Sequence, residues 1–160
     1  MTGQTIEQLV ANQWVERLDA DDAEVLGFWQ RAIESYDDAA TPRLSRTGQF
    51  KLLYDAARQG VVALNAAHGY RAKGAANHHE HTFAAGTVLA PEALTGSIAA
   101  MQTERGVRRD LEYGAHRTVT EAKVSEMRDS VCALLNGLAD EIRRLRPALK
   151  QPIRKLRCSR

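Results

Sequence analysis

The amino-acid sequence predicts an all-α protein, a bundle of five to six helices that forms one domain over residues 1–146 and is followed by a basic tail at 147–160. Three observations support this fold class. Apolar residues recur at intervals of three and four along most of the chain, which is the spacing of one helix face. No segment shows the sustained alternation that is typical of a half-buried strand. A chain of 160 residues that is 44% apolar and 26% charged is also long enough to bury a core of its own.

Two amphipathic helices are expected in the first forty residues. Asp21 and Asp22 stand before the second of them, where carboxylates favour a helix N-terminus because it carries a partial positive charge. Both tryptophans of the chain lie in these stripes and are expected in the core. The first stripe consists of Ile6, Leu9, Val10, Trp14 and Leu18, and the second of Leu26, Trp29, Ile33 and Tyr36.

The two cleanest stripes belong to the third and the last helix. The third helix follows a break at Thr41 and Pro42 and ends near Gly69, and Pro147 ends the last helix. We expect residues 44–67 and 119–146 to pack as a long antiparallel helix pair. Their apolar positions are Phe50, Leu53, Tyr54, Ala57, Val61 and Leu64, and Val124, Met127, Val131, Leu134, Leu138, Ile142 and Leu145.

A loop at residues 69–77 and two more helices are expected between this pair. The loop contains two glycines and two basic side chains, and Pro91 separates the fourth helix from the fifth. Two pairs resemble capping boxes, in which a side chain at the helix start and one three residues later satisfy free backbone N–H groups. These pairs are Asn77 with Glu80 and Thr118 with Glu121.

Charge is distributed unevenly along the chain. Residues 143–160 hold eight basic side chains and no acidic ones, so the preceding 142 residues carry 14 basic and 20 acidic groups, a net charge of −6. A basic tail on an acidic body suggests an anionic partner such as nucleic acid. A solvated tail that only aids solubility is an equal alternative.

The two cysteines, Cys132 and Cys158, are expected to be reduced thiols and not a disulfide framework. The longest uncharged runs, such as residues 82–91, are far shorter than the roughly 20 residues that a membrane span needs. No signal peptide is recognised in residues 1–20. We therefore expect a cytoplasmic protein with no membrane partner.

A polar stripe replaces the apolar one in the second half of the fifth helix. Steps of four and three from Ile98 reach polar side chains that share one helix face, and Arg109 and His116 are expected to be neighbours. The simplest interpretation is a solvated face with Arg–Glu pairs, such as Arg108 with Glu112. The stripe consists of Gln102, Arg105, Arg109, Glu112 and His116, with Arg108 and Tyr113 beside it.

An arginine beside a histidine also suits the cleavage of RNA without a metal. This reaction needs one group that accepts a proton from the 2′-hydroxyl and one that donates a proton to the leaving oxygen. Histidine titrates near neutral pH and can do both. A guanidinium group stabilises the negative charge that the transition state places on the phosphoryl oxygens.

Several segments resemble the HEPN superfamily. Arg109 and Asp110, with six residues between Arg109 and His116, resemble its Arg–(Asn/Asp/His)–x–His signature. The segment FKLLYDAARQGVVALNAAHGYRAKGAANHH is similar to the long helix, Gly-Tyr-Arg turn and histidine-bearing helix start of that family. RGVRRDLEYG and the helix after it are similar to its motif helix and final helix. The resemblance covers about residues 44–145.

The resemblance implies a homodimeric, metal-independent ribonuclease without cofactors, often the toxin of a toxin–antitoxin or phage-defence system. It implies that His116 acts as general acid and base, that Arg109 holds the scissile phosphate and that Asp110 orients Arg109. RNA is then the substrate, and a cognate antitoxin or a nucleotidyltransferase is a possible partner. RNA-binding or supporting roles are expected for Arg105, Arg108, Glu112, Tyr113, Arg71, Lys73, His78 and His79.

Two alternatives stay open. The first is a metal site, because His78, His79 and His81 lie together and imidazole suits zinc, copper or nickel. Helical geometry places His79 about 100° away from His78, and we therefore prefer a polar surface and expect no metal. The second alternative is a catalytically inactive HEPN module whose polar stripe binds a protein partner such as a nucleotidyltransferase.

Overall fold

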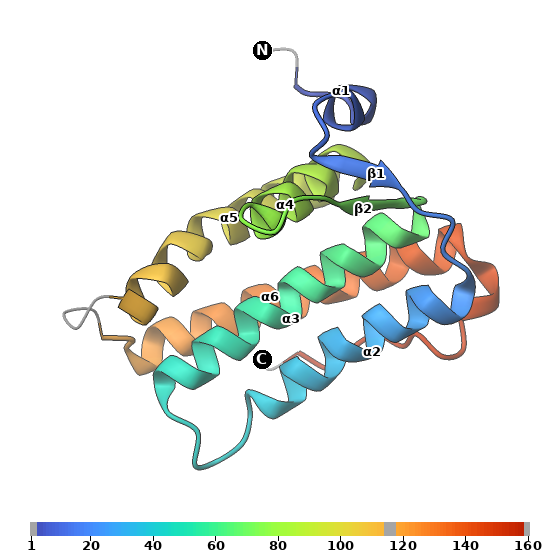
Figure 1. Ribbon diagram of the computed structural model, residues 1–160. Coiled ribbons are helices and arrows are strands. Elements are labelled where there is room, and N and C mark those ends of the chain that lie inside the picture. The colour runs from blue at the N-terminus through green and yellow to red at the C-terminus, as the bar shows by residue number, and fades with distance from the viewer. Residues whose placement is uncertain (1–2, 114–117, 159–160) are drawn as a thin grey trace.

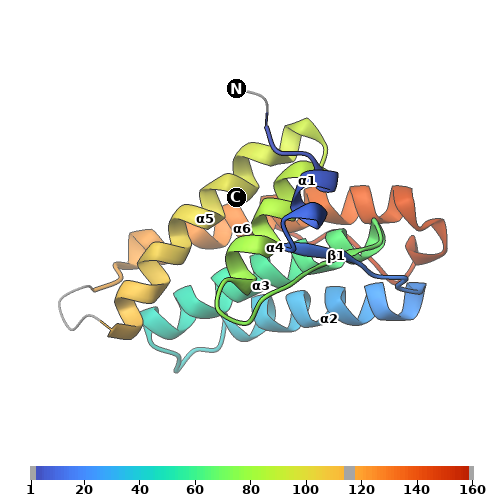
Figure 2. The same cartoon turned by 45° about the horizontal axis from the view of Figure 1, so that its top comes forward.

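The computed structural model describes residues 3–113 and 118–158, which form a helical bundle. It confirms the predicted all-α fold class: six α-helices account for most of the described chain, and one small sheet of two strands accompanies them. Figures 1 and 2 show α3 (Arg46–Ala67) inside the bundle, between α2 (Asp22–Asp38) and α6 (Glu121–Leu145), with α4 (His78–Leu89) and α5 (Glu92–Tyr113) above.

The predicted start of α2 is confirmed in detail. Asp21 is the N-cap residue, and its Oδ1 accepts a hydrogen bond of 2.8 Å from the backbone N–H of Glu24. The Glu24 side chain accepts in return from the Asp21 backbone N–H, at 3.2 Å. Both bonds satisfy N–H groups that a helix leaves free at its start. Trp29 is buried on this helix, as expected.

The helices α3 and α6 run parallel, and the predicted antiparallel arrangement of this pair was wrong. Arg46 and Glu121, at the two helix starts, lie 3.9 Å apart, and the Arg146 guanidinium donates to the carbonyl of Ala67 at the two helix ends. Figure 1 shows both helices running from left to right. The apolar stripes were read correctly, since Val61 and Val131 are fully buried. Periodicity identifies a buried face but not the direction of its partner.

The first predicted helix is much shorter than its apolar stripe. The helix α1 (Ile6–Ala11) ends before Gln13, which has a positive φ of 59°, and the chain continues as the strand β1 (Val15–Arg17). β1 pairs antiparallel with β2 (Tyr70–Ala72), so part of the predicted loop at 69–77 is a strand. Strands of three residues are too short to show a period of two, which is why the sequence did not reveal them.

Neither predicted capping box forms. Asn77 precedes α4 without a side-chain hydrogen bond to the helix, and its φ of −117° and ψ of 21° differ from the extended backbone of most N-caps. At α6 the N-cap is Thr120 and not Thr118. The Thr120 hydroxyl accepts from the backbone N–H of Lys123 at 3.1 Å.

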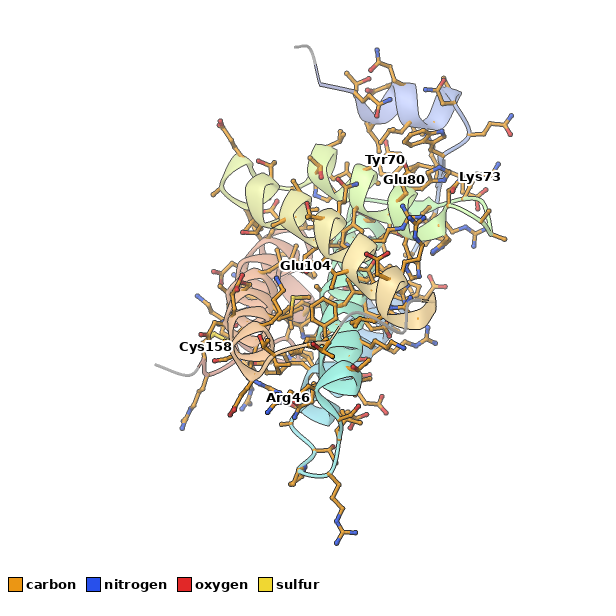
Figure 3. All side chains as sticks on the ribbon, turned by 90° about the vertical axis from the view of Figure 1, so that its left-hand side faces the viewer. Arg46, Tyr70, Lys73, Glu80, Glu104 and Cys158 are labelled. Atoms are coloured by element: carbon orange, nitrogen blue, oxygen red, sulfur yellow. A yellow bond between two sulfur atoms is a disulfide. The ribbon has the colours of Figure 1, made fainter. Side chains whose placement is uncertain are left out.

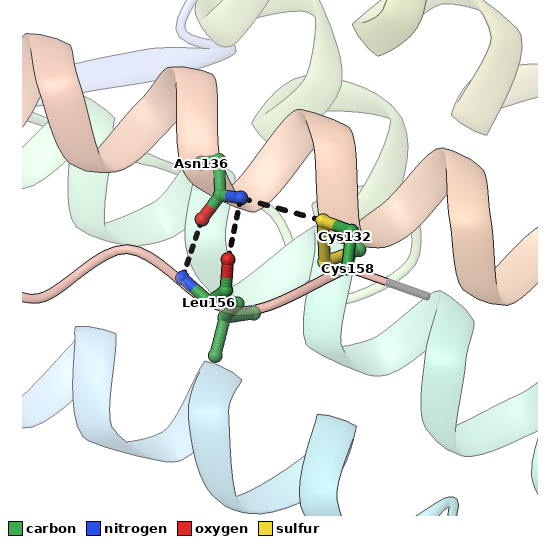
Figure 4. Close-up of a disulfide and its surroundings, with 4 residues drawn as sticks. All are labelled: Cys132, Asn136, Leu156 and Cys158. Carbon is green, nitrogen blue, oxygen red and sulfur yellow. Dashed lines mark hydrogen bonds between the residues drawn. A yellow bond between two sulfur atoms is a disulfide. The ribbon is translucent and has the colours of Figure 1, made fainter. Parts of the chain in front are cut away.

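The basic C-terminal segment is packed against the bundle through residue 158 and does not behave as a free tail. A short 3-10 helix, η1 (Pro147–Leu149), turns the chain back along α6, and Leu149 and Ile153 are buried. The Asn136 side chain on α6 donates to the carbonyl of Leu156 at 3.0 Å and accepts from its N–H at 2.6 Å (Figure 4). The predicted boundary at 146/147 therefore marks the end of α6 and not the end of the packed core.

Cys132 and Cys158 form a disulfide, so the expected free thiols were wrong (Figure 4). Their pairing was hidden because it depends on the return of the C-terminal segment along α6, which brings together residues 26 positions apart. Disulfides persist in oxidising compartments, and the cysteines therefore no longer support the expected cytoplasmic location. Among the described helices, none combines the length and apolarity needed to cross a membrane.

Reduction of this disulfide is expected to lower the free energy of unfolding by about 3 kcal/mol, because a covalent loop spanning 26 residues restricts the unfolded chain. Urea unfolding with and without a reductant measures this difference. Cys158→Ser should lose a similar amount without any reductant, and the reductant should then change nothing further. Equal stability of the oxidised and the reduced protein would contradict the prediction.

Acidic side chains of the bundle partly neutralise the basic segment. Arg146 and Asp22 lie 3.0 Å apart, and Lys155 and Asp140 lie 3.2 Å apart. These pairs connect the segment to α2 and α6. They favour a structural role for part of its charge, beside any attraction of an anionic partner.

Candidate functional site

A cleft of about 240 Å³ lies between the start of α4 and the second half of α5. Figure 3 labels Glu80, in the first turn of α4, which pairs with Arg105 of this cleft, and Lys73, in the loop before α4. Three guanidinium groups and one carboxylate reach the cleft, so its charge is positive. We call it the arginine cleft, and it is lined by Ala75, Ala76, His78, His79, Arg105, Arg108, Arg109 and Glu112.

Helical spacing on α5 explains the basic side of the arginine cleft. Arg105, Arg109 and Glu112 are three or four positions apart and share one face, as the sequence predicted. Gln102, one turn earlier, lines a different hollow beside Trp14. The polar stripe therefore divides between two depressions.

Part of the predicted catalytic group is not described. His116 and the side chain of Tyr113 lie outside the described residues, so the structure does not test whether His116 is close to Arg109. Arg109 is exposed and lines the cleft. Asp110 is also exposed on α5, but it is not among the residues that line the cleft.

Two arginines of the cleft make ion pairs. Arg108 and Glu112 lie 3.2 Å apart, which confirms the pair expected on a solvated helix face, and Arg105 lies 3.6 Å from Glu80 on α4. Arg108 is not fully satisfied by this contact. Its Nε is buried and has no hydrogen-bond partner among the described residues. A buried donor of this kind favours an anionic ligand, because leaving it unpaired costs about 1–3 kcal/mol or more.

His79 lies between the cleft and the core. Its Nδ1 is 3.3 Å from the hydroxyl of Tyr54, which is fully buried on α3, as expected for a core residue. The Arg108 guanidinium lies 5.5 Å above the Tyr54 ring. Burial raises the pKa of Tyr54 to about 12, so this phenol stays protonated. Sequence reasoning placed His79 near the site but did not reveal this contact with the core.

The His79 imidazole is neutral at physiological pH. Burial, followed by the positive charges of Arg58 and Arg108, lowers the pKa of His79 to about 4. Burial also lowers the pKa of His78. A neutral imidazole can accept a proton or donate one hydrogen bond to a phosphate oxygen, but it is rarely protonated at neutral pH and is therefore a poor general acid.

The lowered pKa of His79 predicts a loss of stability as the pH falls from 6.5 to about 4. In this window the unfolded chain, where His79 has its ordinary pKa, binds more protons than the folded chain, so acid favours unfolding. Urea unfolding at both ends of the window measures the loss. His79→Gln should lose less stability over this interval than the wild type, and an equal loss in both proteins would contradict the shift.

The three clustered histidines point to different neighbours. His78 lines the arginine cleft, and His79 contacts Tyr54. The Nδ1 of His81 donates to the carbonyl of Lys73, 2.6 Å away, and the His81 ring stacks on Trp14. Within residues 3–113 and 118–158, no three potential ligands come together in a way that could hold a metal ion. Trp14, which was expected in the core, is only half-buried, and its indole stacks on His81.

The structure brings only some of the predicted RNA-binding residues into the arginine cleft. Arg71 instead forms an ion pair with Glu16 across the two-stranded sheet and lines a separate cavity. Lys73 lies half-buried in the loop before α4 and is not among the residues that line the cleft. Arg58, which the sequence analysis did not select, pairs with Asp55 at 2.7 Å and affects the pKa of both nearby histidines.

Comparison with protein-family models, with curated proteins and with solved structures finds no match to this chain. Membership of the HEPN superfamily therefore stays a prediction, which rests on the sequence segments quoted above.

Proposed function

We propose that this protein is a HEPN-type, metal-independent ribonuclease, and that the arginine cleft holds the phosphate of the bond it cleaves. The observation that carries this proposal is the convergence of three guanidinium groups and two histidines on one cleft. Guanidinium groups bind phosphate oxygens with paired, charge-assisted hydrogen bonds.

Several features of the cleft favour a phosphodiester ligand. Arg109 is exposed, and Arg108 retains a buried Nε donor without a partner in the described chain. His78 and His79 stand in the first turn of α4, where the partial positive charge of a helix start adds to that of the arginines. These groups stabilise the charge that builds up on the phosphoryl oxygens during cleavage.

The proposed reaction is attack of the ribose 2′-hydroxyl on the adjacent phosphorus. A general base accepts the 2′-hydroxyl proton, the bond from phosphorus to the 5′-oxygen breaks, and a general acid protonates that oxygen, leaving a 2′,3′-cyclic phosphate. We assign the acid and base roles to His116, with Arg109 on the phosphate and Asp110 orienting Arg109. His79 is suited to hold a phosphate oxygen, because it is neutral and half-buried.

A homodimer is part of the proposal. Two copies would supply two Arg109/His116 sets, one as base and one as acid in a shared cleft. Light scattering at roughly tens of micromolar protein should report about twice the chain mass of 17.7 kDa. A monomer at this concentration would argue against a shared active site.

Expression in a bacterial host tests the proposed toxin activity. We expect the wild type to arrest growth and degrade cellular RNA, and we expect His116→Ala to do neither at equal protein level. Arg43→Ala is a suitable control, because Arg43 is exposed in the connection between α2 and α3. Equal growth arrest by wild type and His116→Ala would show that His116 is not catalytic.

A catalytically inactive binding module is the second candidate, and the ion pairs favour it. Glu80 and Glu112 already neutralise part of the charge of Arg105 and Arg108. In this case the same face would contact a protein partner, such as a nucleotidyltransferase encoded by a neighbouring gene. Binding of that enzyme without any RNA cleavage would support the second candidate.

A further inference from the structure

A second cavity, of about 260 Å³, shares His78 with the arginine cleft. Side chains of α2, α3 and α4 and residues of β2 form its walls. Phe28 and Val62 are apolar and half-buried there, while Arg31, Arg58 and Arg71 contribute positive charge. We call it the base pocket, for the ligand argued below.

The two cavities are neighbours. His78 lines both of them, and Arg58, which lines the base pocket, lowers the pKa of both His78 and His79 by its charge. Basic side chains therefore continue from Arg109 in the arginine cleft to Arg31 on α2. Asp55 neutralises part of the charge of Arg58 between them. A polyanion bound in the first cavity would therefore lie next to the second, at His78.

The chemistry of the base pocket differs from that of the arginine cleft. Its apolar wall offers a phosphate no hydrogen bonds, but a planar base can stack on Phe28. The Arg31 guanidinium already lies 5.8 Å from the centre of the Phe28 ring. Gln59 and Asn65 supply amides at the same wall. Asn65 is 1% exposed as a residue, and its side-chain amide donates to the carbonyl of Thr82, which fixes its position.

We infer that the base pocket receives the unstacked base of a nucleotide next to the phosphate held in the arginine cleft. This inference rests on the proposed function, since it assumes that RNA occupies the arginine cleft. Bases in a duplex are paired and stacked inside it and cannot enter a side pocket, whereas single strands expose their bases for stacking on aromatic side chains.

Binding of an uncleavable probe tests the inference without depending on catalysis. The probe is a fluorescent single-stranded 2′-O-methyl RNA hexanucleotide, which lacks the attacking hydroxyl, and fluorescence anisotropy measures its affinity. Phe28→Ala should weaken binding by roughly 5- to 150-fold, the range for loss of one stacked base. Arg31→Ala, an exposed position where folding is not at risk, should weaken it less. Arg43→Ala should bind as the wild type does.

Probes with one abasic position locate the base. One abasic position should weaken binding to the wild type and have little further effect in Phe28→Ala, because the variant has already lost the same contact. Duplex RNA should bind more weakly than the single strand. The inference would be overturned if, at every abasic position, Phe28→Ala lost as much further affinity as the wild type does. Equal affinity of the wild type for duplex and single-stranded RNA would overturn it as well.

The outcomes separate this inference from the proposed function. If Arg109→Ala loses binding while Phe28→Ala and Arg31→Ala match the wild type, the base pocket is overturned and the arginine cleft stands. If the probe binds with the predicted base dependence but ordinary RNA is never cleaved, the base pocket is supported and the ribonuclease proposal fails. If the wild type does not bind the probe, the base pocket is overturned.

Discussion

Replacing Arg109 or His116 by alanine is expected to slow RNA cleavage by about 10²- to 10⁴-fold while the protein stays folded. Arg109 is exposed, and substitutions at such positions usually change the free energy of unfolding by less than about 0.5 kcal/mol. A change of this size cannot account for the expected loss of activity. The measurement is the cleavage rate of a single-stranded RNA under saturating protein, together with the melting temperature of each variant.

Two controls make this result specific to the chemistry. Arg109→Lys keeps the charge but loses the paired donors of the guanidinium group, so its rate should lie between the wild type and Arg109→Ala. Arg43→Ala removes a distant exposed arginine and should cleave as the wild type does. If His116→Ala retains the wild-type rate, the assignment of the catalytic histidine fails.

The largest expected effect on stability is that of Leu135→Ala, at about 2–5 kcal/mol. Leu135 is fully buried on α6 and faces α3 at Gly60. A Cβ atom at Gly60 would lie 2.7 Å from the Leu135 Cδ2, so the two helices meet there at close distance. Urea unfolding measures the loss, and Gln30→Ala on the exposed face of α2 should change stability by less than about 0.5 kcal/mol.

A double substitution tests the packing of the parallel pair directly. Gly60→Ala alone should destabilise the wild type by about 1–3 kcal/mol, because the added methyl group collides with the leucine. In the Leu135→Ala background the same change should cost less, since the space has been vacated. Additive effects of the two substitutions would show that these residues are not in contact.

The sequence predicted what depends on local periodicity. The apolar stripes of α3 and α6 are buried as expected, and Asp21 opens α2. The predicted face of α5 holds Arg105, Arg109 and Glu112 at one cleft. All of these features follow from the spacing of residues within a single helix.

Most contacts between segments far apart in the chain could not be predicted from the sequence. The direction of α3 relative to α6 depends on how α4 and α5 return the chain. The spacing of apolar residues within one helix does not indicate this direction. The Cys132–Cys158 disulfide forms only because η1 turns the chain back along α6.

The contact between His79 and Tyr54 joins residues 25 positions apart, and burial at this place, followed by the charges of Arg58 and Arg108, keeps the histidine neutral. A histidine at the start of a helix gives no sign of such a partner in its local sequence. The base pocket was missed for the same reason, since Phe28, Arg58 and His78 come from three different helices.

Analysis of the RNA ends tests the ribonuclease proposal most directly. Protein purified and assayed in EDTA is incubated with a single-stranded RNA, and mass spectrometry identifies the new 3′ ends. The account predicts fragments ending in a 2′,3′-cyclic phosphate, formed at the same rate without EDTA and absent with His116→Ala. RNA that stays intact, cleavage that EDTA abolishes, or fragments ending in a 3′-hydroxyl would contradict the account.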